Sequence, residues 1–88
     1  MYNLEIKPIA EDKFFKLSKK NRFLLEVVNK KVDQILENPY HFKPLHAPMN
    51  HLRRVHIAKS FVLTFRIDEN IKTVVIIDFD HHDSIYKC

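Results

Sequence analysis

The sequence has no glycine and a single cysteine, and both shortages limit what the chain can be. Cys88 has no second cysteine to pair with, so an internal disulfide is excluded. A turn that needs a positive φ angle must use another residue; asparagine and aspartate tolerate that region best, and Asn70 is the expected example. No apolar run reaches the ~18–20 residues that cross a bilayer. Glu5 and Lys7 interrupt the first residues, where a signal peptide needs a continuous hydrophobic stretch.

The rest of the composition is that of a folded domain. Of the 88 residues, 45% are hydrophobic and 30% are charged, whereas disordered chains contain few hydrophobic residues. A chain of this length corresponds to one domain, and we expect residues 1–88 to form it. We also expect a soluble, cytoplasmic protein with no membrane partner.

Acidic residues are missing from the middle of the chain. The whole sequence has a net charge of +4, yet residues 38–67 contain no aspartate or glutamate, and residues 68–88 carry an acidic excess. A basic surface of this kind suits a polyanion, either a nucleic-acid backbone or an acidic protein segment. A basic surface that serves only solubility is the alternative. The cations of the block are Lys43, Arg53, Arg54, Lys59 and Arg66, and four histidines accompany them, namely His41, His46, His51 and His56.

Hydrophobic periodicity predicts one strand, two helices and three further strands. Tyr2, Leu4 and Ile6 alternate with polar residues, as in a half-buried strand that Pro8 ends. Apolar residues recur at the helical period in the next two segments, and Pro39 stops the second. Short connections predict a helical hairpin and an antiparallel meander, whose last strand is central because it is apolar on both faces. The expected helices cover residues 10–19 and 20–37, and the later strands cover residues 52–57, 61–67 and 71–79.

Alternation along the strands predicts which side chains share a face. In the strand at 52–57, Val55 and Ile57 should face the helices; in the next strand Phe61, Leu63, Phe65 and Ile67 should do so. Arginine, histidine and tyrosine gathered on a sheet suit the processing of a phosphodiester, although an ordinary exposed face has a similar composition. The open face is expected to carry Arg54, His56, Val62, Thr64 and Arg66, with His81, His82 and Tyr86 arriving from the end of the last strand.

Three stretches of the sequence carry a recognisable pattern, namely ILENPY (35–40), LRRVHIAKSFVLTFRID (52–68) and VVIIDFDHHDSIY (74–86). In this order they resemble the RelE/ParE superfamily of bacterial and archaeal toxins from toxin–antitoxin systems. The second is similar to the family's Leu-Arg strand, turn and Tyr-Arg-Ile-Asp strand, and the third to its strand ending in Gly-His-Arg before a hydrophobic-Tyr pair. The resemblance extends from the first strand to Tyr86. It implies an α+β fold of order β-α-α-β-β-β, with a helical hairpin packed on one face of a mainly antiparallel four-stranded sheet.

The resemblance also implies an activity. RelE-like members of the family cleave mRNA in the ribosomal A site without a metal or another cofactor: the ribose 2′-OH attacks the adjacent phosphate, leaving a 2′,3′-cyclic phosphate and a free 5′-OH. This chemistry needs a base, a proton donor to the 5′-oxygen, and cations around the phosphate. Carried over by position, the catalytic candidates are Arg54, His56, Arg66, Tyr86 and one of His81 and His82, and the basic block adds Arg53, Lys59 and Lys43 for RNA binding.

The sequence departs from the family pattern in two places. Val62 stands where a catalytic arginine is frequent, so Arg66 or Arg53 would have to supply that charge. The terminal Gly-His-Arg is Asp80-His81-His82 here, which removes an arginine and adds a carboxylate. A metal site at the two histidines is the weaker reading, because adjacent residues on a strand point to opposite faces. For Tyr86, capping of the core is the alternative role.

The family resemblance also implies partners. A cognate antitoxin, acidic and wrapped around the toxin, is expected together with the ribosome and mRNA, and operator DNA only through the toxin–antitoxin complex. Two other functions stay open. A ParE-like toxin poisons gyrase without cutting RNA, although proteins of that branch generally lack the basic and acid–base residues on the sheet. A degenerate toxin would keep the fold and its antitoxin contact as a binding module, a reading that Val62 and the acidic tail favour.

Overall fold

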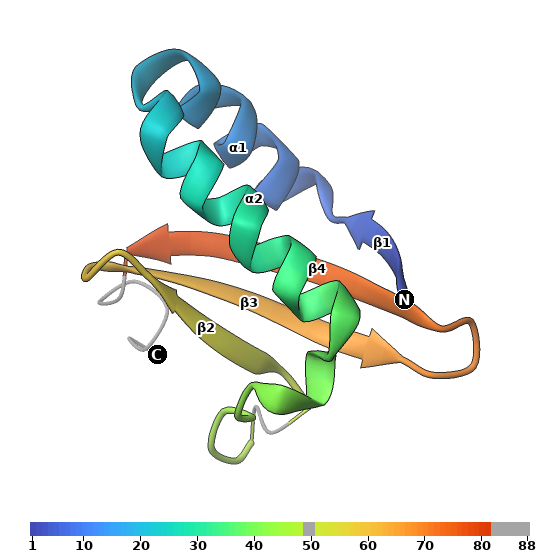
Figure 1. Cartoon of the computed structure of the whole chain (residues 1–88). Helices are drawn as coiled ribbons and strands as arrows, with labels where there is room; N and C mark the ends of the chain where they lie inside the picture. Colours follow the sequence, from blue (N-terminus) through green and yellow to red (C-terminus); the bar gives the residue numbers. More distant parts are fainter. Residues whose placement is uncertain (49–50, 82–88) are drawn as a thin grey trace.

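The computed structural model of the chain describes residues 1–48 and 51–81, in which two helices cover one face of a four-stranded sheet (Figure 1). The strand order is β1-β4-β3-β2, with β1 parallel to β4 and the other two pairs antiparallel. The expected α+β fold and the central place of the last strand are confirmed. Within the described ranges, no helix has the length and apolar character to cross a bilayer. The elements are β1 (Asn3–Ile6), α1 (Pro8–Lys20), α2 (Arg22–Glu37), the 3-10 helix η1 (Pro39–His41), β2 (Arg53–Ile57), β3 (Phe61–Asp68) and β4 (Thr73–His81).

Helices α1 and α2 follow each other with one residue between them. Pro8 starts α1, two residues earlier than expected, because its fixed φ angle and missing N–H suit the first helical turn. Asn21 ends α1 and begins α2: its N–H donates to Leu17 O at 2.8 Å, and its side chain accepts from Leu24 N at 3.1 Å. The short connection that was expected between the helices is therefore a single residue, and the two helices form the predicted hairpin.

The core lies between the helix layer and the sheet. One face of α2 is apolar at the helical period, and it packs against the inward side chains of β2, β3 and β4. Phe61 and Ile67, which were also expected inside, are partly buried against this cluster. The buried members are Ala10, Leu24, Val28, Val32, Ile35, Val55, Ile57, Leu63, Phe65, Val74, Ile76 and Phe79.

Strand β4 contains one residue more than the part of β3 that it pairs with. Thr64 pairs with Asp78, and the next residue of β3 pairs with Ile76, so Ile77 has no counterpart, as in a β-bulge. One inserted residue exchanges the two faces for everything that follows it. Beyond the bulge, Phe79 therefore lies in the core, and the aspartates on either side of it point away from the core.

Two turns use left-handed backbone without glycine. Ala58, between β2 and β3, has a φ angle of 55°, and Lys72, just before β4, has a φ angle of 52°. The expectation that Asn70 takes such a position is wrong. Its N–H instead donates to the Asp68 side chain at 3.1 Å and closes a local turn. For an L-residue with a Cβ atom, the left-handed conformation is about 1–2 kcal/mol less favourable than the right-handed one, so glycine would fit both positions better.

One carboxylate ties together three segments that are distant in sequence. Glu69, in the turn before β4, accepts a hydrogen bond from Tyr2 OH at 2.6 Å and another from the Tyr40 OH of η1. These hydrogen bonds lower the pKa of Glu69, raise the pKa of Tyr2 to about 12, and raise the pKa of Tyr40. Lys72 Nζ and Arg53 Cζ lie over the Tyr2 and Tyr40 rings, 5.1 and 5.0 Å from the ring centres. We call these five residues the Glu69 cluster.

We expect Ala58→Gly to raise the free energy of unfolding by up to about 1 kcal/mol, because glycine removes the Cβ strain while the freer unfolded chain offsets part of that gain. Chemical denaturation of the two proteins measures the difference. Ser60→Gly is the matched control: it lies in the same turn with ordinary backbone and should lower the free energy of unfolding. A glycine at position 58 that leaves stability unchanged or lower would contradict the strain argument.

The Glu69 cluster predicts a tyrosine that titrates late. The pKa of Tyr2 in the folded protein, about 12, lies above the ordinary value near 10 for a phenol. The raised pKa stabilises the folded protein at any pH below the ordinary pKa of a phenol. This stabilisation is lost as the pH rises toward the pKa of Tyr2 in the folded protein. A phenolate absorbance titration should show late ionisation of Tyr2 and Tyr40, and Tyr2→Phe should remove the group with a pKa of about 12. In Glu69→Gln, which keeps an acceptor but loses the charge, the pKa of Tyr2 should fall. A titration that both substitutions leave unchanged would exclude the cluster.

Candidate functional site

The face of the sheet opposite the helices carries three basic residues from two neighbouring strands. Arg54 and His56 lie on β2, whose intervening residues are buried in the core. Arg54 pairs with Thr64, and Arg66 lies two residues further along β3, so the two arginines are diagonal neighbours with their Cα atoms about 7–8 Å apart. Arg54 and Arg66 are half-buried, and His56 is exposed. The structure thus brings these three residues, which we call the basic cluster, to one face.

The middle of this face is closed to solvent. Val62 is 0% exposed, Thr64 is 3% exposed and Val75 is 1% exposed, although none of them belongs to the core under the helices. They lie on β3 and β4, which have a neighbouring strand on each side. Val62 and Thr64, which alternation turns outward, are therefore not open to solvent. The basic cluster borders an apolar centre.

Arg53 is turned away from the basic cluster. It pairs with Phe65, a core residue, so its side chain leaves β2 on the helix side. Its Nη1 donates to Phe42 O at 2.7 Å, and its guanidinium belongs to the Glu69 cluster. Arg53 therefore cannot replace, on the open face, the positive charge of the arginine that is frequent at the position of Val62.

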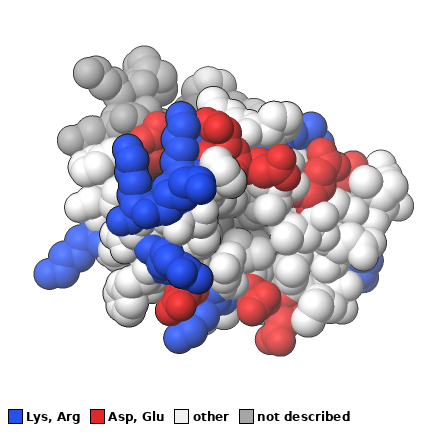
Figure 2. All heavy atoms as spheres, turned by 90° about the horizontal axis from the view of Figure 1, so that it is seen from above, with Lys and Arg blue, Asp and Glu red and all other residues white. Residues whose placement is uncertain are grey.

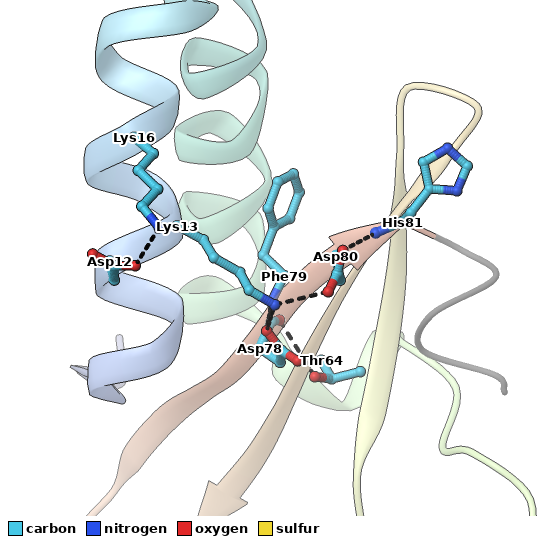
Figure 3. Close-up of polar contacts among 8 residues, drawn as sticks. All are labelled: Asp12, Lys13, Lys16, Thr64, Asp78, Phe79, Asp80 and His81. Atoms are coloured by element: carbon cyan, nitrogen blue, oxygen red, sulfur yellow. Dashed lines mark hydrogen bonds and ion pairs between the residues drawn. The ribbon is translucent and has the colours of Figure 1, made fainter. Parts of the chain in front are cut away.

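His81 also lies on the helix side of the sheet. It pairs with Phe61, and its ring meets that of Phe61 edge-on, with the ring centres 5.4 Å apart. In Figure 3 the side chains of Phe79 and His81 point the same way, away from the aspartates of β4. Regular alternation from Val75 puts His81 on the open face, but the bulge at Ile77 reverses the order. The expected meeting of His81 with the basic cluster does not occur.

A lysine of the helix layer reaches both aspartates of β4 (Figure 3). Lys13 Nζ lies 2.8 Å from Asp78 Oδ1 and 2.8 Å from Asp80 Oδ2, and we call these two aspartates the carboxylate pair. Burial alone lowers the pKa of Lys13, but its hydrogen bonds to the pair outweigh burial and raise it. The hydrogen bond from Lys13, followed by that from the His81 N–H, lowers the pKa of Asp80. The sequence analysis missed Lys13, because its partners lie 65 and 67 residues away and no motif joins them.

A small groove runs beside the basic cluster. The segment before β2 follows the outer edge of that strand: Lys43 O accepts the Arg54 N–H at 3.2 Å, and the Leu45 N–H donates to Leu52 O at 2.8 Å. This pairing brings Lys43 next to the basic cluster, whereas Lys59 is exposed in the turn at the end of β2. The groove has a volume of about 230 Å³ and is lined by His41, Phe42, Lys43, Arg54, Val55 and His56.

A larger groove lies between α1 and the end of the sheet. Its volume is about 410 Å³; its floor is apolar, and its rim carries lysines of α1 together with Asp80. Seen from above the helix layer, Lys and Arg side chains gather on one part of the surface with Asp and Glu beside them (Figure 2). The lysines of α1 on this rim lie outside residues 38–67, so the basic surface is not confined to that block. The lining residues are Lys13, Lys16, Leu17, Lys20, Phe61, Phe79 and Asp80.

The chemistry available to the open face is that of phosphate binding and proton transfer. Guanidinium groups hold phosphate oxygens by charge-assisted hydrogen bonds, and an imidazole exchanges a proton near neutral pH. In residues 1–48 and 51–81, no three His, Cys, Asp or Glu side chains are grouped so as to hold a metal ion. His82 and Tyr86, the remaining candidates, lie outside the described residues.

Comparisons with known proteins match nearly the whole chain. The family model described as the ParE toxin of the type II toxin–antitoxin system parDE matches residues 4–86. A protein of Methanocaldococcus jannaschii that bears the provisional name toxin RelE4 is 52% identical over 87 residues, which are 99% of this chain and 93% of the relative.

Solved structures of toxins share the fold, among them these two. A chain of the toxin–antitoxin complex RelBE2 from Mycobacterium tuberculosis is 27% identical with a TM-score of 0.73, over 92% of this chain and 98% of that one. The YoeB/ParE toxin from Agrobacterium tumefaciens is 14% identical with a TM-score of 0.83, over 91% of this chain and 98% of that one, which shows the shared fold alone. The family match, the close relative and the fold agree, and the protein belongs to the RelE/ParE superfamily as a toxin of a type II toxin–antitoxin system.

Proposed function

We propose that this toxin is a ribosome-dependent endoribonuclease that cleaves mRNA and thereby inhibits translation. The basic cluster is the observation that supports this most, because two guanidinium groups and an imidazole on one face of the sheet suit the binding of phosphate. The relative with the RelE name, at 52% identity, supports the same activity. Gyrase poisoning has no need of an acid–base group beside paired arginines.

The proposed reaction forms a bond from the ribose 2′-oxygen to phosphorus and breaks the bond from phosphorus to the 5′-oxygen. One proton leaves the 2′-oxygen and another reaches the 5′-oxygen, so the step needs a base and an acid. Arg66 and Arg54 stabilise the negative charge that builds on the phosphate oxygens. His56, on the same face, takes one of the two proton transfers. His82 and Tyr86 remain predicted participants, and His81 has no assigned step because it lies on the helix side.

The proposed partners follow from the charge of the molecule. Residues 38–67 carry five cations and no carboxylate, which suits mRNA and the ribosome as well as an acidic antitoxin. The likeness to a chain of a toxin–antitoxin complex supports a cognate antitoxin. The ribosome would hold the message in line for attack, which is the contribution that so small a face cannot make alone. Operator DNA would be reached only through the toxin–antitoxin complex.

Gyrase poisoning is the second candidate. Two observations favour it: the matching family model is described as a ParE toxin, and Val62, buried at the centre of the open face, stands where RelE-like toxins frequently have an arginine. The same valine is compatible with a degenerate toxin that only binds its antitoxin. One set of assays separates the three functions.

In a translating extract, the purified toxin should cut mRNA at defined positions that primer extension maps. The same mRNA without ribosomes should be cut poorly at physiological salt, because the positioning by the ribosome is then missing. A gyrase cleavage assay on supercoiled DNA is run in parallel. Efficient cutting of naked mRNA would contradict ribosome dependence, and gyrase cleavage complexes without mRNA cleavage would establish the second candidate.

Arg66→Ala should reduce mRNA cleavage by a factor of about 10²–10³ and relieve toxicity, because removal of one transition-state donor typically has an effect of this size. Arg22→Ala is the matched control, since Arg22 is an exposed arginine at the start of α2 on the helix side. It should leave cleavage unchanged. Chemical denaturation of both variants reports whether the fold is intact. Cleavage by Arg66→Ala at the parent rate would remove Arg66 from the mechanism.

A further inference from the structure

The carboxylate pair lies in register with the basic cluster. Arg54 pairs with Thr64, which pairs with Asp78; His56 pairs with Val62, which pairs with Asp80. Each carboxylate is therefore two strands away from a basic residue on the same face. Two strand spacings put the backbones about 10 Å apart, close to the Debye length at physiological salt, so charges of the pair would still influence a phosphate bound by the basic cluster.

Uncompensated, two carboxylates at this place would oppose the binding of RNA. Like charges about 10 Å apart repel at the surface of a protein, and the effect is larger where water is partly excluded. Val62 and Thr64 lie between the pair and the β2 members of the basic cluster, and both are buried and uncharged, so no cation on β3 intervenes there. The sequence alone shows that Asp80 adds a negative charge, but it does not show a cation that neutralises it.

Lys13, on α1, supplies a positive charge next to the two carboxylates. β1 pairs with residues 73–76 of β4, and α1 approaches the edge of β4 beyond them. Lys13 bonds to both carboxylates at 2.8 Å, with 29% of its side chain exposed. The pair together with Lys13 therefore carries one negative charge instead of two.

We infer that Lys13 is a positioning residue of the proposed RNA-binding face: it holds Asp78 and Asp80 by their carboxylates so that phosphate can approach the basic cluster. This role rests on the proposed function, because it presumes that RNA binds the open face. Lys13 lies 40 residues or more from the basic cluster in sequence, and its hydrogen bonds go to the carboxylate pair, so we expect its effect to be transmitted by charge.

The test measures the binding of a fluorescent single-stranded RNA oligonucleotide and, separately, mRNA cleavage on ribosomes. Lys13→Met keeps the apolar stem of the side chain and removes the charge. It should weaken RNA binding about fivefold to tenfold at low salt and less at high salt, because screening reduces the repulsion. Lys16→Met is the matched control on the same helix, where Lys16 pairs with Asp12 at the surface, and it should have a smaller effect.

Second-site changes separate charge from structure. Asp80→Asn in the Lys13→Met background should restore RNA binding, and Lys13→Arg should retain it. Asp80→Asn alone should tighten RNA binding, a measurement that stays informative if Lys13→Met fails to fold. A loss in Lys13→Met that Asp80→Asn does not restore, or a single Asp80→Asn variant that binds no better than the parent, would overturn the inference.

Failure of the proposed function gives a different result. A parent protein that binds RNA with the predicted charge dependence but cleaves no mRNA on ribosomes would refute the endoribonuclease and leave the role of Lys13 supported. A parent that does not bind RNA at all would overturn both.

Discussion

The extra residue in β4 decides what each face of the sheet contains. Without the bulge at Ile77, Phe79 would point outward and the aspartates beside it would enter an apolar core, where an unpaired charge is very unfavourable. With the bulge, the Phe79 ring enters the core and stacks on Phe61, and both carboxylates reach Lys13. Core packing and the charge balance of the open face therefore depend on the same inserted residue.

Most of the fold was predictable because its patterns are local in sequence. The helical period along α2 and the alternation along β2 and β3 depend only on neighbouring residues, so the elements, their order and the central strand were correct. Helix and strand ends differ by a residue or two, as for β4, expected at 71–79 and found at Thr73–His81. The left-handed positions at Ala58 and Lys72 were missed, because hairpin register selects them and no glycine marks them.

In the candidate site, too, the residues placed by local patterns were predictable and those placed by distant contacts were not. Arg54, His56 and Arg66 were placed together because β2 and β3 pair without irregularity between Arg53–Phe65 and Ile57–Phe61. His81 was misplaced because a bulge leaves no trace in an apolar run. Lys13 was missed because a contact across 65 residues is a property of the assembled fold, and only the structure shows it.

The single residue between the two helices constrains how this family member can change in length. Asn21 both ends α1 and caps α2, so the connection between the two helices contains no additional residue that could absorb a change in length. One inserted residue within either helix would turn everything beyond it by about 100°, since an α-helix has 3.6 residues per turn, and would rotate the apolar face of α2 off the sheet. Insertions are tolerated where backbone is exposed and outside regular elements, as in much of the stretch between η1 and β2. That stretch also walls the groove beside Arg54, so changes in loop length would alter the approach to the basic cluster while the helix hairpin stays fixed.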